Sequence, residues 1–262
     1  MAGPGDLSHI HDLALDDDGA LLVASHFGLY RIDDVDTAVL IGSARHDLMS
    51  MTRLDGGDLI ASGHPDLRGD EYRRAGLPPH FGLVASEDLG QTWTVTGGLG
   101  EKDFHALAPT DDGIYAAEAT TKSIWLLDPA GEWQQLGDLE ARDLAVNPSN
   151  SELQIATDFD NQLWISNDAA TSWQQPPDRP NMVEVEWLSA DELYGIDAAG
   201  KILAASSLDG EWGVITAGPA EPETFFASNA TNWWVTTHGG RIFSTDNAGD
   251  DWTDVYVPAD QR

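Results

Sequence analysis

Five of the ten tryptophans stand at a nearly constant spacing along the chain. They are Trp93, Trp133, Trp173, Trp212 and Trp252, and successive members lie 40, 40, 39 and 40 residues apart. Such a period is typical of architectures that repeat one supersecondary unit, because a single unit cannot bury its own hydrophobic face. This repeat therefore constrains the fold more than any other feature of the 262 residues.

A short polar motif precedes the repeated tryptophans. Its three clearest copies begin at Ser86, Ser166 and Ser244, and weaker copies end at Trp133 and Trp212. Serine and aspartate side chains hydrogen-bond to the backbone of a turn, glycine accepts a positive φ, and tryptophan covers the end of the hairpin. We therefore expect structural roles for Ser86, Asp88, Gly90, Trp93, Ser166, Asp168, Trp173, Ser244, Asp246 and Trp252.

Short apolar segments fill each period. Before Trp173 they cover 143–146, 153–156 and 162–166, and a further strand is expected after the tryptophan. Four short strands in about 40 residues match a propeller blade. The sequence therefore predicts one all-β domain over 1–262, a six-bladed β-propeller with four antiparallel strands per blade. The expected blades cover 9–45, 46–101, 102–140, 141–180, 181–222 and 223–260, with an insert at 64–80 in the second.

The charge is strongly negative, with Asp plus Glu at 45, Lys plus Arg at 13 and a formal net charge of −32. Binding to nucleic acid requires a basic surface and is therefore excluded, and the same charge argues against docking on anionic lipid. The 41% of apolar residues indicates a folded core. We interpret the acidity as that of a halophile's protein, in which concentrated salt screens the self-repulsion.

Cysteine is absent, which excludes disulfides, a thiolate nucleophile and Cys-ligated metals. No apolar run is long enough to span a membrane. The segment from Met1 to Ser8 lacks the charged start and apolar stretch of a signal peptide. We expect a monomer in a high-salt environment, cytoplasmic by default, with an exported mature form as the alternative.

The eight histidines map to strand beginnings and to loops between second and third strands. On such a map all of them lie on one face of the propeller, opposite the turns of the polar motif. With two aspartates at equivalent positions, they give a candidate ligand-binding set at the mouth of the central channel: His9, His11, His26, Asp47, His64, Asp103, His105 and His238.

His9, His11 and His105 are the candidate metal ligands within this set, because side chains at i and i+2 of a strand point to the same side. Imidazole and carboxylate suit Zn, Cu, Mn or Fe in a protein without cysteine. Histidines that only cap strand ends by hydrogen bonding are the alternative. The arginines of the insert, Arg68, Arg73 and Arg74, are expected to pair with acidic neighbours rather than with an anionic ligand.

Several motifs together resemble short BNR/Asp-box propellers known as glycosyl-hydrolase-like or exo-sialidase-like. The motifs are His9-Ile-His11, Ala24-Ser-His26-Phe-Gly-Leu29, Ser62-Gly-His64-Pro65 and Asp103-Phe-His105-Ala-Leu107. The resemblance covers nearly the whole chain and marks His9, His11, His26, Asp47, His64, Asp103 and His105 as recurrent polar positions. Leu48, the longer Arg-bearing insert and His80-Phe81 depart from the family pattern.

A true sialidase is not expected, because it needs a Tyr nucleophile and an Arg cluster for the substrate carboxylate. Of the tyrosines only Tyr72 is expected at the functional face, and the first-blade Arg motif of sialidases is missing. Three hypotheses follow for the function. The first is a propeller that binds a divalent metal or small ligand at the His/Asp-lined mouth, with an undetermined activity. The second is a glycoside hydrolase-like enzyme that uses histidines and carboxylates there, with a glycan as substrate. The third is a scaffold that binds another protein.

Overall fold

The computed structural model describes Leu7 and residues 9–262, which are almost entirely β-strand and turn. Residues 1–6 and Ser8 lie outside the described part, and the expectation about a signal peptide falls mainly on them. In the described part, no helix is long and apolar enough to cross a membrane. The C-terminal 3₁₀-helix η1 covers only Ala259–Gln261.

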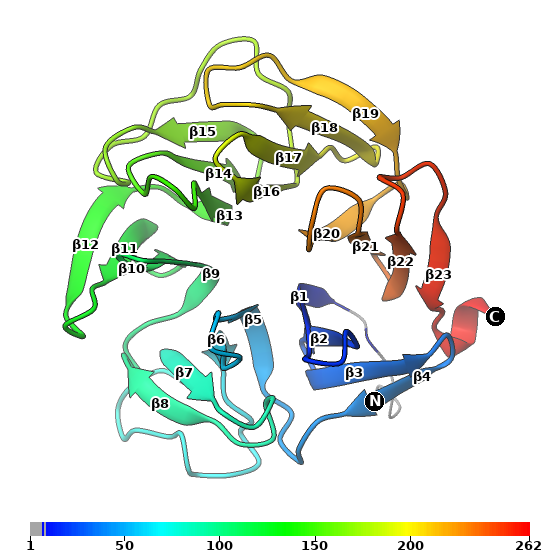
Figure 1. The fold of residues 1–262 in the computed structure, drawn as a ribbon. Coiled ribbons are helices and arrows are strands. Elements are labelled where there is room, and N and C mark those ends of the chain that lie inside the picture. The colour runs from blue at the N-terminus through cyan, green and yellow to red at the C-terminus, as the bar shows by residue number, and fades with distance from the viewer. Residues whose placement is uncertain (1–6, 8) are drawn as a thin grey trace. The chain divides into compact units, whose positions relative to one another are not determined.

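Six antiparallel sheets follow one another along the described chain (Figure 1), and they are the blades of a six-bladed β-propeller. The predicted fold class is therefore confirmed. By its contacts the chain divides into two compact units. Unit 1 comprises the chain up to His105 together with His238–Ile242 and Asp254–Arg262, and unit 2 comprises Ala106–Thr237 and Phe243–Thr253.

Unit 1 contains the first two sheets complete. The first is β1 (Ile10–Leu15), β2 (Leu21–Ser25), β3 (Gly28–Asp34) and β4 (Thr37–Leu40). The second is β5 (Asp47–Arg53), β6 (Leu59–His64), β7 (Leu83–Ser86) and β8 (Thr94–Gly97). The insert joins β6 to β7. The amide of Val257 donates to the carbonyl of Val35 at 2.8 Å, which ties the C-terminal segment to the turn between β3 and β4.

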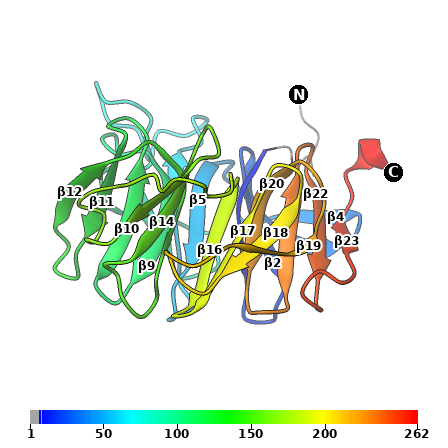
Figure 2. The ribbon, with the colours of Figure 1, turned by 90° about the horizontal axis from the view of Figure 1, so that it is seen from above.

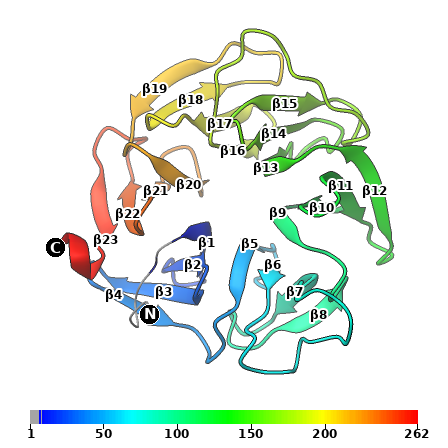
Figure 3. The same cartoon turned by 180° about the vertical axis from the view of Figure 1, so that it is seen from behind.

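Unit 2 contains the fourth and fifth sheets complete, and the dividing points fall within β9, β22 and β23. The third sheet is β9 (Phe104–Thr110), β10 (Gly113–Glu118), β11 (Ser123–Leu127) and β12 (Trp133–Asp138), and the fourth is β13 (Ala141–Val146), β14 (Gln154–Asp158) and β15 (Leu163–Ser166). The fifth is β16 (Glu184–Ser189), β17 (Glu192–Ile196), β18 (Lys201–Ala205) and β19 (Gly213–Ala217), whose strands run side by side in Figures 2 and 3. The sixth is β20 (Pro222–Ala227), β21 (Trp233–Thr237), β22 (Arg241–Thr245) and β23 (Thr253–Tyr256).

The fourth sheet departs from the predicted four strands. Its outer strand is reduced to one bridge, in which Ile165 pairs with Gln174. Three prolines follow within the next six residues, Pro176, Pro177 and Pro180. Proline has no amide hydrogen to donate to a neighbouring strand, which explains why pairing stops here.

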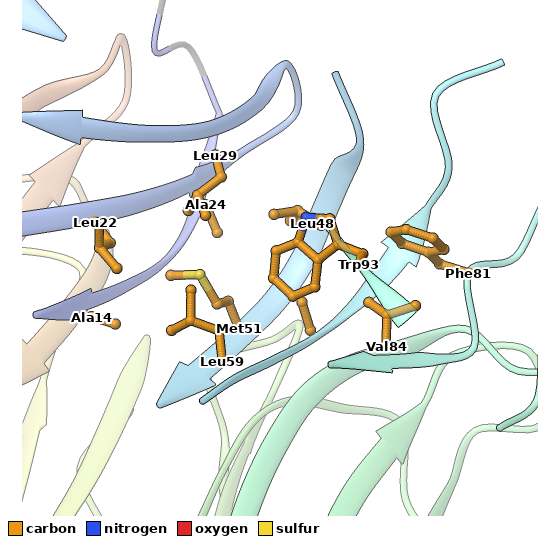
Figure 4. Packing of buried hydrophobic residues seen from close by; sticks show 11 residues of the cluster. Ala14, Leu22, Ala24, Leu29, Leu48, Met51, Leu59, Phe81, Val84 and Trp93 are labelled. Atoms are coloured by element: carbon orange, nitrogen blue, oxygen red, sulfur yellow. The ribbon is translucent and has the colours of Figure 1, made fainter. Parts of the chain in front are cut away.

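The outer strand of the first sheet is much less buried than the strands inside it. Every residue of β2 is buried, whereas in β4 exposed residues alternate with half-buried ones. In unit 1 the apolar side chains of the first two sheets form one core, in which Trp93 packs near Leu48 and Met51 (Figure 4). Leu48 and Met51 are fully buried, so this core fixes the strand β5 that carries Asp47.

The polar motif before the tryptophans forms hydrogen-bonded turns. The amide of Gly90 donates to the hydroxyl of Ser86 at 2.7 Å, and the amide of Thr92 donates to Oδ1 of Asp88 at 2.8 Å. The turn that begins at Ser166 repeats these bonds through Ser166 and Asp168. These bonds explain the recurrence of serine and aspartate, while membership of the BNR family stays a prediction.

The third copy of the motif is shifted by one residue from its expected register. Its turn bonds are accepted by Thr245 and Asn247, because the amide of Gly249 donates to Thr245 and that of Asp251 to Asn247. The expected pair was Ser244 and Asp246. Thr245 stands seven residues before its tryptophan, as Ser86 and Ser166 do, so the fixed distance selects it.

Candidate functional site

Asp47 is the centre of the first cluster of histidines in unit 1. It begins β5 and pairs in register with His64 at the end of β6. His11 lies in β1, and His26 lies in the turn between β2 and β3. Strand β1 is tied to β5 because the amide of Met51 donates to Oδ2 of Asp12 at 2.9 Å.

Three imidazoles surround the Asp47 carboxylate. His26 Nδ1 lies 2.9 Å from Oδ2, His64 Nδ1 lies 3.3 Å from the same oxygen, and His11 Nε2 lies 3.5 Å from Oδ1. The aspartate side chain is only 17% exposed. A carboxylate so far removed from water is stable as an anion only when its surroundings supply positive charge or donors.

Asp103 is the centre of a second cluster that shares His64 with the first. It precedes β9, and its Oδ2 lies 3.4 Å from His64 Nε2 and 3.3 Å from His105 Nε2. The beginning of β9 is held by two bonds. The amide of Phe104 donates to the hydroxyl of Ser62 at 3.0 Å, and the hydroxyl of Ser50 donates to the carbonyl of Phe104 at 3.1 Å.

The electrostatics of the two clusters depend on His64, which lies between the carboxylates. Hydrogen bonds to Asp103 and Asp47 raise the pKa of His64 to about 10. Burial by itself raises the pKa of each aspartate, but bonds to the histidines outweigh it, and both pKa values lie well below the ordinary value. In the metal-free protein His64 is therefore a cation between two anions.

Two groups of three residues each have one ligand atom per residue within 4.8 Å of the others. The Asp47 group is His11, His26 and Asp47, and the Asp103 group is His64, His80 and Asp103. Among the described residues, His11 Nε2 and Asp47 Oδ1 are both buried and have no hydrogen-bond partner, since their separation of 3.5 Å is too long for a good bond. Such buried atoms carry a desolvation cost that a bound cation would remove.

The expected trio of His9, His11 and His105 is not the one that the structure groups. His9 precedes β1 with a positive φ of 58°, and a bulge at His11 interrupts the strand register, so the i, i+2 argument does not apply. The ring of His9 instead lies edge-on to that of His26, with centroids 6.3 Å apart. His238 is exposed in the turn between β21 and β22 and belongs to neither group.

His80 was missing from the candidate set, although it belongs to the Asp103 group. Its position at the end of the insert that begins at His64 was the available signal. His46, by contrast, is structural. Its ring packs on Phe81 with centroids 4.5 Å apart, and its Nδ1 accepts the amide of Asp66 at 2.9 Å.

The arginines of the insert bond mostly within the insert itself, and Arg68 also donates to the carbonyl of Ser43 outside it at 3.2 Å. Arg68 pairs with Asp66, and Arg73 lies 3.2 Å from Asp70. Arg74 donates to the carbonyls of Glu71 and Arg73. The expected pairing with acidic neighbours therefore describes Arg68 and Arg73, while Arg74 bonds to backbone oxygens.

Neither models of protein families nor curated protein sequences give a match to this chain. Solved structures do, at low identity. A GH74 xyloglucanase from Xanthomonas campestris is 19% identical with a TM-score of 0.60, and the match covers 95% of this chain but 38% of that one. This chain thus spans well under half of the xyloglucanase.

Two smaller propellers match over most of their own length. A virginiamycin B lyase from Staphylococcus aureus, a catalytically inactive His-to-Ala variant with quinupristin, is 12% identical, with 97% of this chain and 86% of that one covered and a TM-score of 0.61. A presumed gluconolactonase is also 12% identical, with 96% and 91% covered and a TM-score of 0.66. At such identities the likeness extends to the fold alone.

Proposed function

We propose that the protein binds a divalent transition metal at the Asp47 group. The observation that carries the proposal is the pair of buried, unpartnered atoms His11 Nε2 and Asp47 Oδ1, with His26 Nδ1 on the other carboxylate oxygen. Two imidazoles and one carboxylate suit Zn, Cu, Mn or Fe better than Mg or Ca, which prefer oxygen ligands. The low pKa of Asp47 keeps that ligand anionic at neutral pH.

The arrangement also supports hydrolytic or related chemistry at this site. Three protein ligands leave a coordination position open, which is the pattern of catalytic rather than structural sites. When bound, such an ion supplies Lewis acidity. His105, with Nε2 buried and 3.3 Å from Asp103, is the side chain best placed to accept a proton, because Asp103 would stabilise the imidazolium.

A glycoside hydrolase-like mechanism without metal is the second candidate, since two carboxylates flank His64. Such enzymes need one carboxylic acid that stays protonated near neutral pH. The pKa values of Asp47 and Asp103 are both lowered, which argues against either as that acid. Solved propellers that act on glycans support this candidate only through their fold.

The experiment measures metal content and affinity of protein purified in concentrated salt. We expect wild-type protein to bind Zn²⁺ or Mn²⁺, and His26→Ala and His11→Ala to remove binding at the Asp47 group. His238→Ala is the matched control, because that histidine is exposed and outside both groups. Wild-type protein that binds none of Zn, Cu, Mn or Fe would refute the proposal and favour a scaffold. Turnover of a glycoside panel by metal-free protein would favour the second candidate.

A further inference from the structure

The insert between β6 and β7 leaves and re-enters the sheet at two histidines of one group. It begins at His64, the last residue of β6, and ends at His80, just before β7. Next to these ends, the amide of Phe81 donates to the carbonyl of Gly63 at 2.7 Å. The amide of Gly100 donates to the carbonyl of His80 at 2.9 Å. Both ends of the insert therefore meet at the Asp103 group.

Between its ends the insert has few attachments to the core. The hydroxyl of Tyr72 donates to the carbonyl of Trp93 at 3.0 Å, and its ring packs on Phe81 with centroids 4.8 Å apart. Most residues from Leu67 to Pro79 are exposed. Arg68 Nη2 also donates to the carbonyl of Ser43 at 3.2 Å, and Asp66 bonds to the amide of Arg45 and to His46 near the start of the insert. The order of the part from Leu67 to Pro79 therefore depends mainly on Arg68, Tyr72 and the two ends of the insert.

The donors of the Asp103 group are arranged for a cation. His80 Nδ1 is buried and has no hydrogen-bond partner among the described residues, and the rings of His64 and His80 have centroids 5.9 Å apart. His64 Nε2 faces Asp103 Oδ2 at 3.4 Å. His105 Nε2, which is buried and has no hydrogen-bond partner in the described part of the chain, approaches the same oxygen from outside the group at 3.3 Å.

We propose that the Asp103 group is a second transition-metal site, and that metal bound there pins the two ends of the insert together. This proposal takes the class of metal, a divalent transition metal, from the proposed function, and its ligands are a separate set of residues. Two imidazoles and a carboxylate form a donor set that suits Zn²⁺. The insert is then a loop that metal orders, rather than a segment held by its own contacts alone.

His64 links the two sites. With Nε2 toward the Asp103 group, its Nδ1 faces Asp47 Oδ2 at 3.3 Å. A hydrogen bond from the second ring nitrogen of a metal-bound histidine to a carboxylate fixes the orientation of the ring. Here that carboxylate is itself a ligand of the first site, so occupancy of either site positions a ligand of the other.

The test combines zinc stoichiometry with hydrogen exchange of the insert. We expect two Zn²⁺ per wild-type chain, and one in both His80→Ala and His26→Ala. Adding Zn²⁺ should slow exchange of the Leu77 and Phe81 amides about tenfold or more in wild-type protein and in His26→Ala, but not in His80→Ala. Tyr72→Phe removes the hydrogen bond to Trp93 and leaves every metal ligand in place, so this variant should still bind two Zn²⁺ per chain.

The outcomes separate the two proposals. The second site would be overturned if wild-type protein and His80→Ala both bind one Zn²⁺ per chain. It would also be overturned if zinc does not change the hydrogen exchange of the insert. Loss of one ion in His80→Ala and none in His26→Ala would overturn the Asp47 group and leave the second site standing. Tryptophan fluorescence checks that each variant is folded, and His80→Gln replaces the alanine variant if that one is not.

Discussion

Acidification should destabilise the protein through His46, which lies beside Asp47 in the sequence but faces the core. Burial lowers the pKa of His46 from 6.5 to about 4, against the opposing charge of Asp66. Only 4% of the residue is exposed, so solvent screening is small. Its Nδ1 accepts a hydrogen bond, which means that protonation also replaces an acceptor by a donor facing the Asp66 amide.

The sign and size follow from proton linkage. A histidine whose pKa is lowered on folding stabilises the native state above pH 6.5, and this contribution is lost as the pH falls toward the folded value. The difference between 6.5 and about 4 corresponds to about 3 kcal/mol, of which about 2 kcal/mol is lost between pH 7 and pH 5.

Chemical denaturation at pH 7 and pH 5, in concentrated salt and without metal, measures this loss. His46→Asn is the comparison, because its Oδ1 can accept the Asp66 amide but cannot be protonated. We expect the free energy of unfolding to fall by about 2 kcal/mol more in the wild type than in the variant over this interval. The other groups titrate alike in both proteins and cancel. Equal pH dependence would refute the assignment of a buried, neutral His46.

Three further predictions concern the charge of His64, the backbone at Gly63 and the salt concentration. The pKa of His64 is raised to about 10, so its contribution to the stability of metal-free protein is complete below pH 6.5 and is lost as the pH rises through about 10. His64→Gln should therefore flatten the dependence of the free energy of unfolding on pH between pH 7 and pH 10.5. An unchanged dependence would contradict an ion-paired, cationic His64. Gly63→Ala should destabilise the protein by at least about 2 kcal/mol in thermal melts, because the φ of Gly63 is +129° and a Cβ there would lie 2.2 Å from the carbonyl oxygen of Asp47. Gly56→Ala is the control and should be nearly neutral, because a Cβ at Gly56 meets no described atom within 4 Å. Dialysis into about 0.1 M salt, where the Debye length is about 10 Å, should unfold the protein by circular dichroism, and full stability there would reject the interpretation as a halophile's protein.

The repeat made the fold predictable, because the constant tryptophan spacing reports one supersecondary unit per period. Besides the missing outer strand of the fourth sheet, the error Ser244 for Thr245 came from two adjacent hydroxyl residues that both fit the motif. Only the hydrogen bonds of the turn distinguish them.

The site was predictable as a set of residues but not as groups. Strand ends identified His26, Asp47, His64 and Asp103, because polar residues at the end of a buried strand are visible in the sequence. The grouping depends on the register of β5 against β6 and on a bulge at His11, which are set by pairing between distant segments. His80 was missed because 15 residues lie between it and His64, and no local pattern indicates that a loop returns to its start.

The incomplete fourth sheet has a consequence for association between copies of the chain. Strand β15 presents backbone groups that a fourth strand would otherwise pair, and an open edge of this kind is a template onto which another molecule's strand can add. Like-charge repulsion protects an acidic protein from such aggregation in dilute buffer, but concentrated salt removes that protection. The three prolines of 176–180 have no amide hydrogen, so the segment that follows the bridge lacks the row of donors that a regular fourth strand would offer. This segment is therefore a poor partner for the strand of another molecule at any ionic strength, whereas protection by charge depends on the salt.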